Sequence, residues 1–342
     1  PELWILEHPD ILINLQTEYL KAGTDILYTP TFSGNRLKLA EYGLEGQVES
    51  LNQKLVSLSK EAVKRFYEET SANRKVYLAG DLTMTGVQLA PMGTLQFEEL
   101  IEVYKEQIQS LVDSGVDLLV IETMMSLQEC RAALLAAKES CDLPVMITLT
   151  FGQDKRTLYG TNPKTAIIVL EAMGAAAVGI NCSTGPEDMV EILSEMKQYA
   201  GIPLIAKPNA GLPKLYGKQA VYEMKAEEFA QKSKQLIVAG AGILGGCCGT
   251  TPEHIHHLKE MTKEFEVPVI EKRIVRALTT ERKTLFLPLD GAFQIIGERI
   301  NPTGKKALQQ ELKEGKFDLV TTMAQEQTKA GAGILDLNMG MN

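Results

Sequence analysis

The sequence lacks the features that mark nucleic-acid-binding, membrane and secreted proteins. Positive charge is in deficit: 35 Lys and Arg against 44 Asp and Glu give a formal net charge of −9, whereas binding to phosphates needs clustered basic residues. The apolar runs, such as 118–121 and 202–206, are far shorter than the roughly 20 residues that span a bilayer. No charged-then-apolar leader opens the chain. We therefore expect no nucleic-acid partner and no membrane partner.

Cysteine is also scarce. Five cysteines occur, at positions 130, 141, 182, 247 and 248, and an odd number in a long chain indicates reduced thiols and a cytoplasmic location. Cys130 and Cys141 fall on or just after a predicted helix with apolar neighbours, so we interpret them as packing residues. The chain starts with Pro1 rather than Met and stops at Asn342 in mid-pattern, so we expect a fragment of a longer protein.

A repeated unit predicts the architecture. A glycine that follows a helical pattern precedes a short apolar run at Gly23, Gly115, Gly174, Gly240 and Gly331. Glycine just past a helix supplies a left-handed C-cap, and the continuous apolar run fits a strand buried on both faces. Strands are predicted near 25–29, 75–80, 117–122, 144–150, 176–181, 203–207 and 242–246, with amphipathic helical stretches between them.

This alternation is typical of a parallel α/β fold. Count and spacing favour a (β/α)₈ TIM barrel over a doubly wound sheet, and a helical pattern at 10–22 precedes any strand, so we expect a barrel lacking its first strand. The predicted barrel covers residues 1–265, and a charged linker covers 266–292. A strand–helix pattern over 293–342 predicts the truncated start of a second α/β barrel.

Polar side chains stand where the predicted strands end. Seven residues after four of these glycines, Gly115, Gly174, Gly240 and Gly331, come Glu122, Asn181, Cys247 and Asn338. Chemistry in parallel α/β folds gathers at the carboxyl ends of strands. Glu122 is accordingly a candidate for binding a substrate ammonium, and the alternative is a rim carboxylate in an ordinary ion pair.

Three of the cysteines suggest a metal site. Cys247 and Cys248 are adjacent and flanked by glycines; a disulfide between them would be strained, whereas a relaxed backbone lets both thiols face one ion. Cys182 ends a different strand, and barrel closure would bring it close. Three thiolates suit Zn²⁺ with its fourth position open, and the alternative is ordinary buried thiols. Such an ion would take up an exogenous thiol and keep it nucleophilic, which predicts alkyl transfer to sulfur.

The histidines that follow these cysteines favour another role. His254, His256 and His257 fall on the helix predicted to begin at Pro252, and it leads away from the strand end. We therefore predict helix capping or exposure to solvent for them rather than metal ligation.

Two motifs carry a family resemblance. Gly-Ile-Asn-Cys at 179–182, with Gly-Gly-Cys-Cys-Gly-Thr-Thr-Pro-Glu-His at 245–254, resembles the homocysteine S-methyltransferase family. The resemblance runs from about 9 to 264 and includes Thr-Pro-Thr-Phe at 29–32. It implies a (β/α)₈ barrel in which Cys182, Cys247 and Cys248 bind Zn²⁺ and, through it, the homocysteine sulfur. It also implies that Glu122 contacts the substrate amino group, and we place Asn181 with it as a substrate-binding residue.

The C-terminal stretch resembles a second domain. Ile-Ile-Gly-Glu-Arg-Ile-Asn-Pro-Thr-Gly at 295–304 is similar to the start of the pterin-binding domain of cobalamin-dependent methionine synthases, and Leu-Asp-Leu-Asn at 335–338 is similar to the next strand of that domain. This implies a methyltetrahydrofolate site lined by Glu298, Asn301, Asp336 and Asn338, since carboxylates and amides suit the edge of a pterin. Strand-end capping is the alternative for Glu298 and Asn301.

Together the two resemblances imply the N-terminal part of an enzyme that makes methionine. The methyl group would come from methyltetrahydrofolate through cobalamin, and the cobalamin module would lie in a missing part or a separate chain. Two alternatives stay open: a homocysteine S-methyltransferase that uses a small onium methyl donor, and a non-catalytic zinc- or thiol-binding protein.

Overall fold

The computed structural model describes residues 2–217 and 219–340, and the chain forms two compact units. The first unit runs to Ile274 and includes Thr280–Lys283. The second comprises Val275–Thr279 and the chain from Thr284 onward. The predicted domain boundaries, with their assigned roles, stay predictions.

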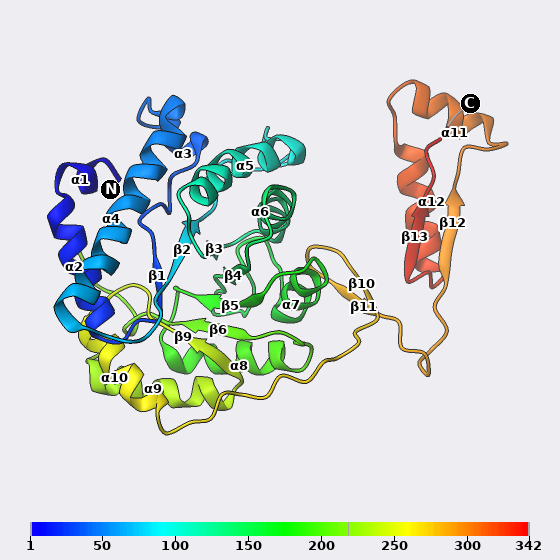
Figure 1. Cartoon of the computed structure of the whole chain (residues 1–342). Coiled ribbons are helices and arrows are strands. Elements are labelled where there is room, and N and C mark those ends of the chain that lie inside the picture. The colour runs from blue at the N-terminus through cyan, green and yellow to red at the C-terminus, as the bar shows by residue number, and fades with distance from the viewer. Residues whose placement is uncertain (1, 218, 341–342) are drawn as a thin grey trace. The chain divides into compact units, whose positions relative to one another are not determined.

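The first unit is built on a parallel sheet whose strand order follows the sequence (Figure 1). In spatial order its strands are β1 (Ile26–Tyr28), β2 (Tyr77–Leu82), β3 (Leu118–Met124), β4 (Val145–Leu149), β5 (Ala177–Asn181), β6 (Leu204–Lys207) and β9 (Ala241–Leu244). Sequential order is the winding of a barrel, whereas a doubly wound sheet reverses direction at its first strand. The prediction of a barrel-type fold without its first strand is therefore confirmed, with β1 and β9 as the two end strands of the described sheet.

Helices cover the outer face of this sheet (Figure 1). The longer ones are α2 (Pro9–Lys21), α4 (Val48–Thr70), α5 (Phe97–Asp113), α6 (Leu127–Ser140), α7 (Pro163–Ala172), α8 (Pro186–Lys197), α9 (Ala226–Val238) and α10 (Pro252–Thr262), with short α1 (Glu2–Glu7), α3 (Arg36–Ala40) and the 3₁₀ turn η1 (Glu45–Gln47). Side chains alternate along β3: Leu119 and Ile121 pack against the helices, while Leu118 and Val120 join the inner cluster. Both faces of the strands are buried, which explains their continuous apolar runs.

The second unit contains the predicted strand–helix pattern. The parallel strands β12 (Ile296–Ile300) and β13 (Ile334–Leu337) pair, and α11 (Lys306–Lys313) and α12 (Asp318–Lys329) connect them. Sequence analysis did not predict two small antiparallel ladders, β7 (Lys214–Tyr216) with β8 (Gln219–Val221) and β10 (Ala277–Thr279) with β11 (Thr284–Phe286). Within the described residues, no helix has the length and apolar character needed to cross a membrane.

Candidate metal centre

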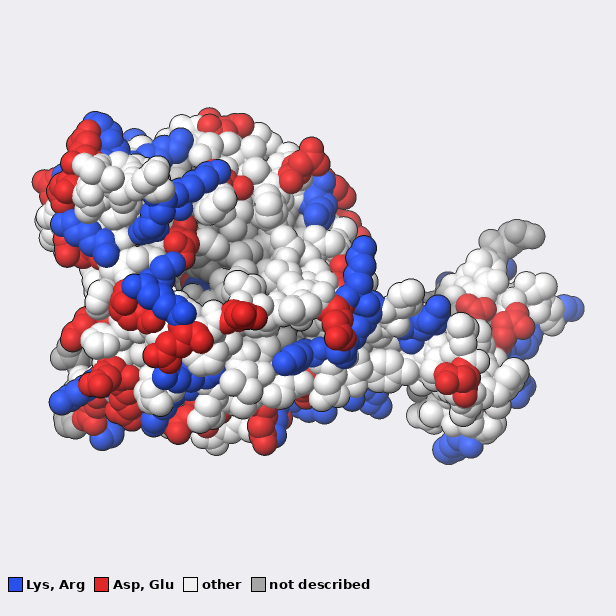
Figure 2. Space-filling model, turned by 60° about the horizontal axis from the view of Figure 1, so that its bottom comes forward, with Lys and Arg blue, Asp and Glu red and all other residues white. Residues whose placement is uncertain are grey.

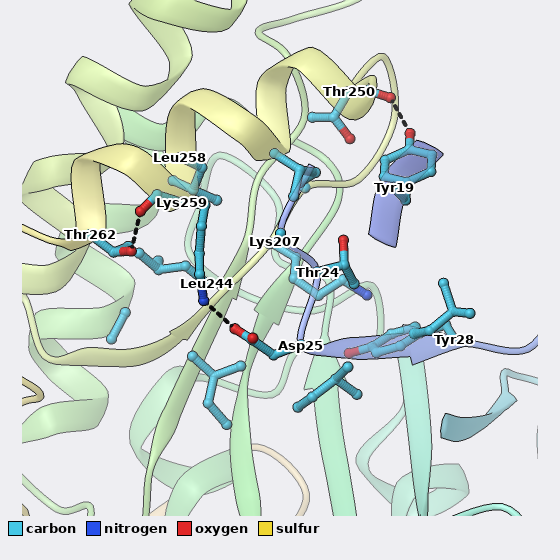
Figure 3. Close-up of a pocket in the computed structure, with 18 of the residues that line it drawn as sticks. Tyr19, Thr24, Asp25, Tyr28, Lys207, Leu244, Thr250, Leu258, Lys259 and Thr262 are labelled. Atoms are coloured by element: carbon cyan, nitrogen blue, oxygen red, sulfur yellow. Dashed lines mark hydrogen bonds and ion pairs between the residues drawn. The ribbon is translucent and has the colours of Figure 1, made fainter. Parts of the chain in front are cut away.

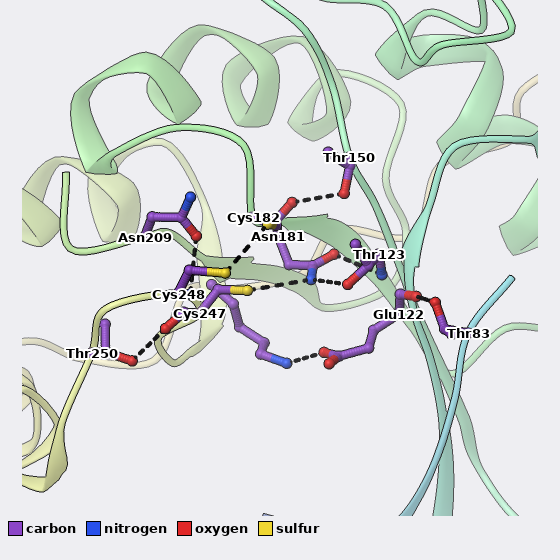
Figure 4. Close-up of polar contacts among 11 residues, drawn as sticks. Thr83, Glu122, Thr123, Thr150, Asn181, Cys182, Asn209, Cys247, Cys248 and Thr250 are labelled. Carbon is purple, nitrogen blue, oxygen red and sulfur yellow. Dashed lines mark hydrogen bonds and ion pairs between the residues drawn. The ribbon is translucent and has the colours of Figure 1, made fainter. Parts of the chain in front are cut away.

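Three sulfur atoms converge at the carboxyl ends of β5 and β9 (Figure 4). The Sγ atoms of Cys182, Cys247 and Cys248 all lie within 4.8 Å of one another, and those of Cys182 and Cys248 are 3.8 Å apart. A tetrahedral zinc ion with Zn–S bonds of about 2.3 Å holds its sulfur ligands about 3.8 Å apart. The donor set and its spacing therefore fit zinc, with one coordination position left for a ligand.

The backbone at the end of β6 holds both cysteine segments. The Cys182 N–H donates to Lys207 O at 3.1 Å, and the Cys247 N–H donates to Pro208 O at 2.8 Å. Cys182 itself has φ +62° and Ser183 φ +65°, left-handed values that are uncommon for side-chain-bearing residues and that cluster at functional sites. The bend turns the Cys182 thiol toward the loop after β9.

Two glycines of the 245–250 segment, Gly246 and Gly249, lie where neighbouring side chains come close to the backbone. A Cβ at Gly246 would collide with the Thr250 side chain, which donates to Cys247 O at 2.7 Å. Gly249 has φ +79°, and a Cβ there would collide with the ring of Tyr222. The compact turn that aims both thiols at one point therefore requires glycine at these positions.

Two asparagines position the cysteines. The Asn209 Oδ1 accepts the N–H of Cys248 at 3.0 Å. Asn181 is 1% exposed; its amide donates to Thr123 Oγ1 at 2.8 Å and lies 3.9 Å from Cys247 Sγ. Asn181, predicted to bind substrate, thus faces the sulfur cluster. Asn209 was missed, although a polar side chain two residues after the buried strand 204–207 is a signal that could have found it.

The three thiols differ in acidity. A hydrogen bond from Cys247 lowers the pKa of Cys182 to about 6. The same hydrogen bond, together with burial, raises the pKa of Cys247, and burial raises that of Cys248. The cluster therefore holds one thiolate, that of Cys182, near neutral pH. A cation that replaced the thiol protons of Cys247 and Cys248 would stabilise these two residues as thiolates as well.

A cavity of about 770 Å³ adjoins the cluster between β1 and β9 (Figure 3). Cys247, Glu122 and Lys207 line it together with apolar side chains of α2 and α10. Glu122 and Lys207 form an ion pair with side-chain exposures of 12% and 11%. The predicted substrate-binding carboxylate is thus in the cavity but already has a cationic neighbour. Figure 2 shows one face of the molecule, where the first unit is hollowed and charged side chains surround the hollow.

Two contacts close the edge of the cavity: one joins α2 to the loop before α10, and the other joins α10 to the residue before β1. The Tyr19 hydroxyl donates to Thr250 O at 2.9 Å. Lys259 Nζ lies 2.6 Å from Asp25 Oδ2 (Figure 3). These contacts connect the flanks of the two end strands.

His254 has the predicted capping role. Its Nδ1 lies 2.9 Å from Thr251 Oγ1 and accepts the Thr251 N–H at 3.3 Å, and its Nε2 lies 2.9 Å from Met224 O. Among the described residues, the His/Cys/Asp/Glu groups that could hold a metal comprise the three cysteines alone. Of the other thiols, Cys130 is buried in α6 and Cys141 half-buried at its end.

The predicted pterin-binding residues lie in the second unit, on its two paired strands or directly after them. Glu298 and Asp336 are exposed on β12 and β13. The side chains of Asn301 and Asn338 accept backbone N–H groups two residues further on, at 2.9 and 3.0 Å. Because β12 and β13 are paired and parallel, the four residues lie on neighbouring strands, Glu298 and Asp336 within them and Asn301 and Asn338 directly after them.

Comparison with known proteins agrees with this fold. The metallated form of the homocysteine methyltransferase MmuM from Escherichia coli superimposes with a TM-score of 0.64 at 24% identity, covering 76% of this chain and 88% of that one. Methionine synthases from Mycobacterium tuberculosis and Mycobacterium leprae are 29% and 28% identical over 96% of this chain. The chain spans about 28% of the length of these two relatives.

The fold and the cysteine cluster define a barrel-type α/β protein with a candidate thiolate metal site, and the family match confirms the prediction of a methyltransferase. The homocysteine S-methyltransferase family model matches residues 1–262, and the chain belongs to that family.

Proposed function

We propose that this chain binds homocysteine as a thiolate at a zinc site formed by Cys182, Cys247 and Cys248, and that the thiolate accepts a methyl group to give methionine. The observation that carries the proposal is the convergence of three cysteine sulfurs beside a cavity, in a chain of this family. The distance between two of them, 3.8 Å, suits tetrahedral ligation.

The side chains of this chain bind and orient the substrate. A zinc ion held by the three thiolates would supply an open position at which the substrate thiol loses its proton and stays nucleophilic. Asn181 and Asn209 hold Cys247 and Cys248 in place, and Glu122 lies in the cavity where a substrate ammonium would be placed. In the reaction the sulfur forms a bond to the methyl carbon, and the donor leaves with the electron pair of the bond that breaks.

For the methyl source, we propose methyltetrahydrofolate acting through cobalamin. The relatives named methionine synthase support this, as does the position of Glu298, Asn301, Asp336 and Asn338 on or directly after the two paired strands of the second unit. A cobalamin-binding module outside this chain would be its partner.

The described cysteines form no disulfide, which supports a reducing, cytoplasmic location.

Zinc-edge X-ray absorption of the zinc-loaded chain tests the proposal. We expect three sulfur ligands in the resting protein and four after homocysteine is added, because the thiolate takes the open position. Homoserine, with a hydroxyl in place of the thiol, serves as the control and leaves the count at three. An unchanged count with homocysteine would contradict the proposal.

A further inference from the structure

The three cysteines of the candidate metal centre differ in their exposure to solvent. Cys248 is exposed, whereas Cys182 and Cys247 are half-buried. We propose that Tyr222 shields the sulfur of Cys248 through a hydrogen bond, so that an alkyl donor reacts with the substrate thiolate and not with this metal ligand. The inference rests on the proposed function, because it concerns thiolates that share a zinc ion with the substrate.

A site with three thiolate ligands has a problem of selectivity. Three protein sulfurs lie beside the substrate sulfur, and each thiolate is a nucleophile. In a side reaction the ligand sulfur would form a bond to the donor carbon, the leaving group would depart with the electron pair of the broken bond, and the metal would lose a thiolate ligand. Cys248 is the ligand most open to such a donor, because it is the exposed one. A group that lowers the nucleophilicity of this sulfur alone would protect the site.

Tyr222 lies directly against Cys248. Its hydroxyl makes a hydrogen bond with the Cys248 side chain. Its ring packs on the next residue, Gly249, where a Cβ would be 2.3 Å from both the Cβ and the Cγ of Tyr222. A thiolate has no proton to donate, so the phenol is the donor when Cys248 is ionised. Such a hydrogen bond makes the sulfur less basic, and a less basic thiolate is a weaker nucleophile.

The backbone near Tyr222 is fixed to the cysteine segment. Two residues further on, the Met224 N–H donates to Ala210 O at 3.3 Å, and the Ala210 N–H donates to Cys248 O at 2.9 Å. Met224 O also lies 2.9 Å from Nε2 of His254, on the helix that follows the cysteines. Tyr222, which is half-buried, therefore has a defined place beside Cys248.

Packing alone would require only the ring of Tyr222. A phenylalanine would fill the space beside Gly249 equally well, so packing does not explain the hydroxyl or its sulfur partner. Each sulfur of the cluster has one polar side chain against it: Asn209 at Cys182, Asn181 at Cys247 and Tyr222 at Cys248. Groups that hydrogen-bond to metal ligands orient them and tune the metal. The phenol thus has this role at the exposed ligand.

Site-resolved alkylation of the zinc-loaded chain tests the inference. Iodoacetamide is the probe, and mass spectrometry of the digested protein gives the rate of reaction at each cysteine. In Tyr222→Phe, which keeps the ring, we expect Cys248 to react about 3- to 10-fold faster, with unchanged rates at Cys182 and Cys247. The factor follows from a hydrogen bond that lowers thiolate basicity about 10- to 100-fold and a Brønsted slope of about 0.4–0.5.

Tyr42→Phe is the matched control. It removes a hydroxyl from a tyrosine that is 66% exposed between α3 and η1, so all three cysteines should react as in the unchanged protein. Zinc content is measured in both variants and should equal that of the unchanged protein.

Cobalt(II) in place of zinc gives a second readout, which a purely structural role of the ring would not move. Loss of a hydrogen bond raises the energy of the sulfur lone pair. The thiolate-to-cobalt charge-transfer band of Tyr222→Phe should therefore shift to longer wavelength, while Tyr42→Phe keeps the band of the unchanged protein. An unshifted band in Tyr222→Phe would contradict the inference.

The outcomes separate the two claims. If zinc slows the alkylation of none of the three cysteines in the unchanged protein, the proposed function is wrong and the inference fails with it. If zinc protects them, but Cys248 reacts no faster in Tyr222→Phe or all three cysteines react faster by the same factor, the proposed function stands and Tyr222 is only a packing residue.

Discussion

At the scale of single residues, the three cysteine thiols differ in pKa. Cys182 has a pKa of about 6, because the Cys247 thiol donates a hydrogen bond to it. The pKa values of Cys247 and Cys248 are raised instead, by that hydrogen bond and by burial. At pH 7 the cluster therefore carries one thiolate and two thiols, and zinc must displace the protons of the latter.

This difference predicts the proton count of zinc binding. At pH 7 we expect about two protons released per zinc, rising toward about three below pH 6 as Cys182 also becomes protonated. Zinc affinity should consequently fall as the pH is lowered, and fall more steeply below pH 6. Calorimetric titrations in buffers of different ionisation enthalpy measure the count. Release of about three protons at pH 7 would show that Cys182 has an ordinary thiol pKa.

The sequence was most informative about single residues where strands end. Counting from the repeat glycines led to Cys247 and Glu122, and both line the cavity. Lys207 was not predicted as a site residue, because a charged residue at a strand end is common and its burial depends on neighbours from other strands. The substrate-binding role of Asn181 stays a prediction. Its hydrogen bond to Thr123 could not be predicted, because it depends on the close approach of β3 and β5.

At the scale of elements, α10 fixes the far end of the cysteine loop. The helix begins at Pro252 after Thr251, whose N–H donates to the His254 ring. That ring also lies 2.9 Å from Met224 O, so the helix start is tied to the segment that precedes α9. The arrangement has a histidine where the usual capping box has Glu or Gln.

Replacement of His254 tests this cap. We expect His254→Ala to lower the free energy of unfolding of the first unit by about 1 kcal/mol. The reason is that the N–H of Thr251, the N-cap residue, loses the His254 ring nitrogen that accepts its hydrogen bond. His254→Gln should restore most of that loss, since Gln suits the same position of a capping box. Urea unfolding measures both, with the exposed His256→Ala as the control. An equal loss in the Ala and Gln variants would assign the effect to packing against Phe229 rather than to the cap.

Strands and helices were predictable because their signals are local. The apolar runs after the five repeat glycines form the strands β1, β3, β5, β9 and β13. The ladders β7–β8 and β10–β11 were missed since three-residue strands are too short for a periodic pattern. The β7–β8 ladder matters to the site: Tyr222 follows it, and its ring packs where Gly249 has no side chain.

At the scale of the whole molecule, the site depends on segments far apart in the chain. Cys182 and Cys248 are separated by 66 positions, yet their sulfur atoms lie 3.8 Å apart, because β6 lies between β5 and β9 in the sheet. Sequential strand order could be predicted from the repeat, and with it the convergence of the cysteines. The cavity between β1 and β9 could not, because it depends on how helices α2 and α10 meet across the end strands.

Zinc content is the most direct test of the central claim that three cysteines from two strand ends bind one ion. After purification with zinc and removal of loosely bound metal, we expect about one zinc per unchanged chain, and most of it lost in Cys182→Ala and in Cys247→Ala, because two thiolates bind zinc far more weakly than three. Cys141→Ala, a half-buried cysteine outside the cluster, should keep the metal. Stoichiometric zinc in folded Cys182→Ala or Cys247→Ala protein would contradict the account.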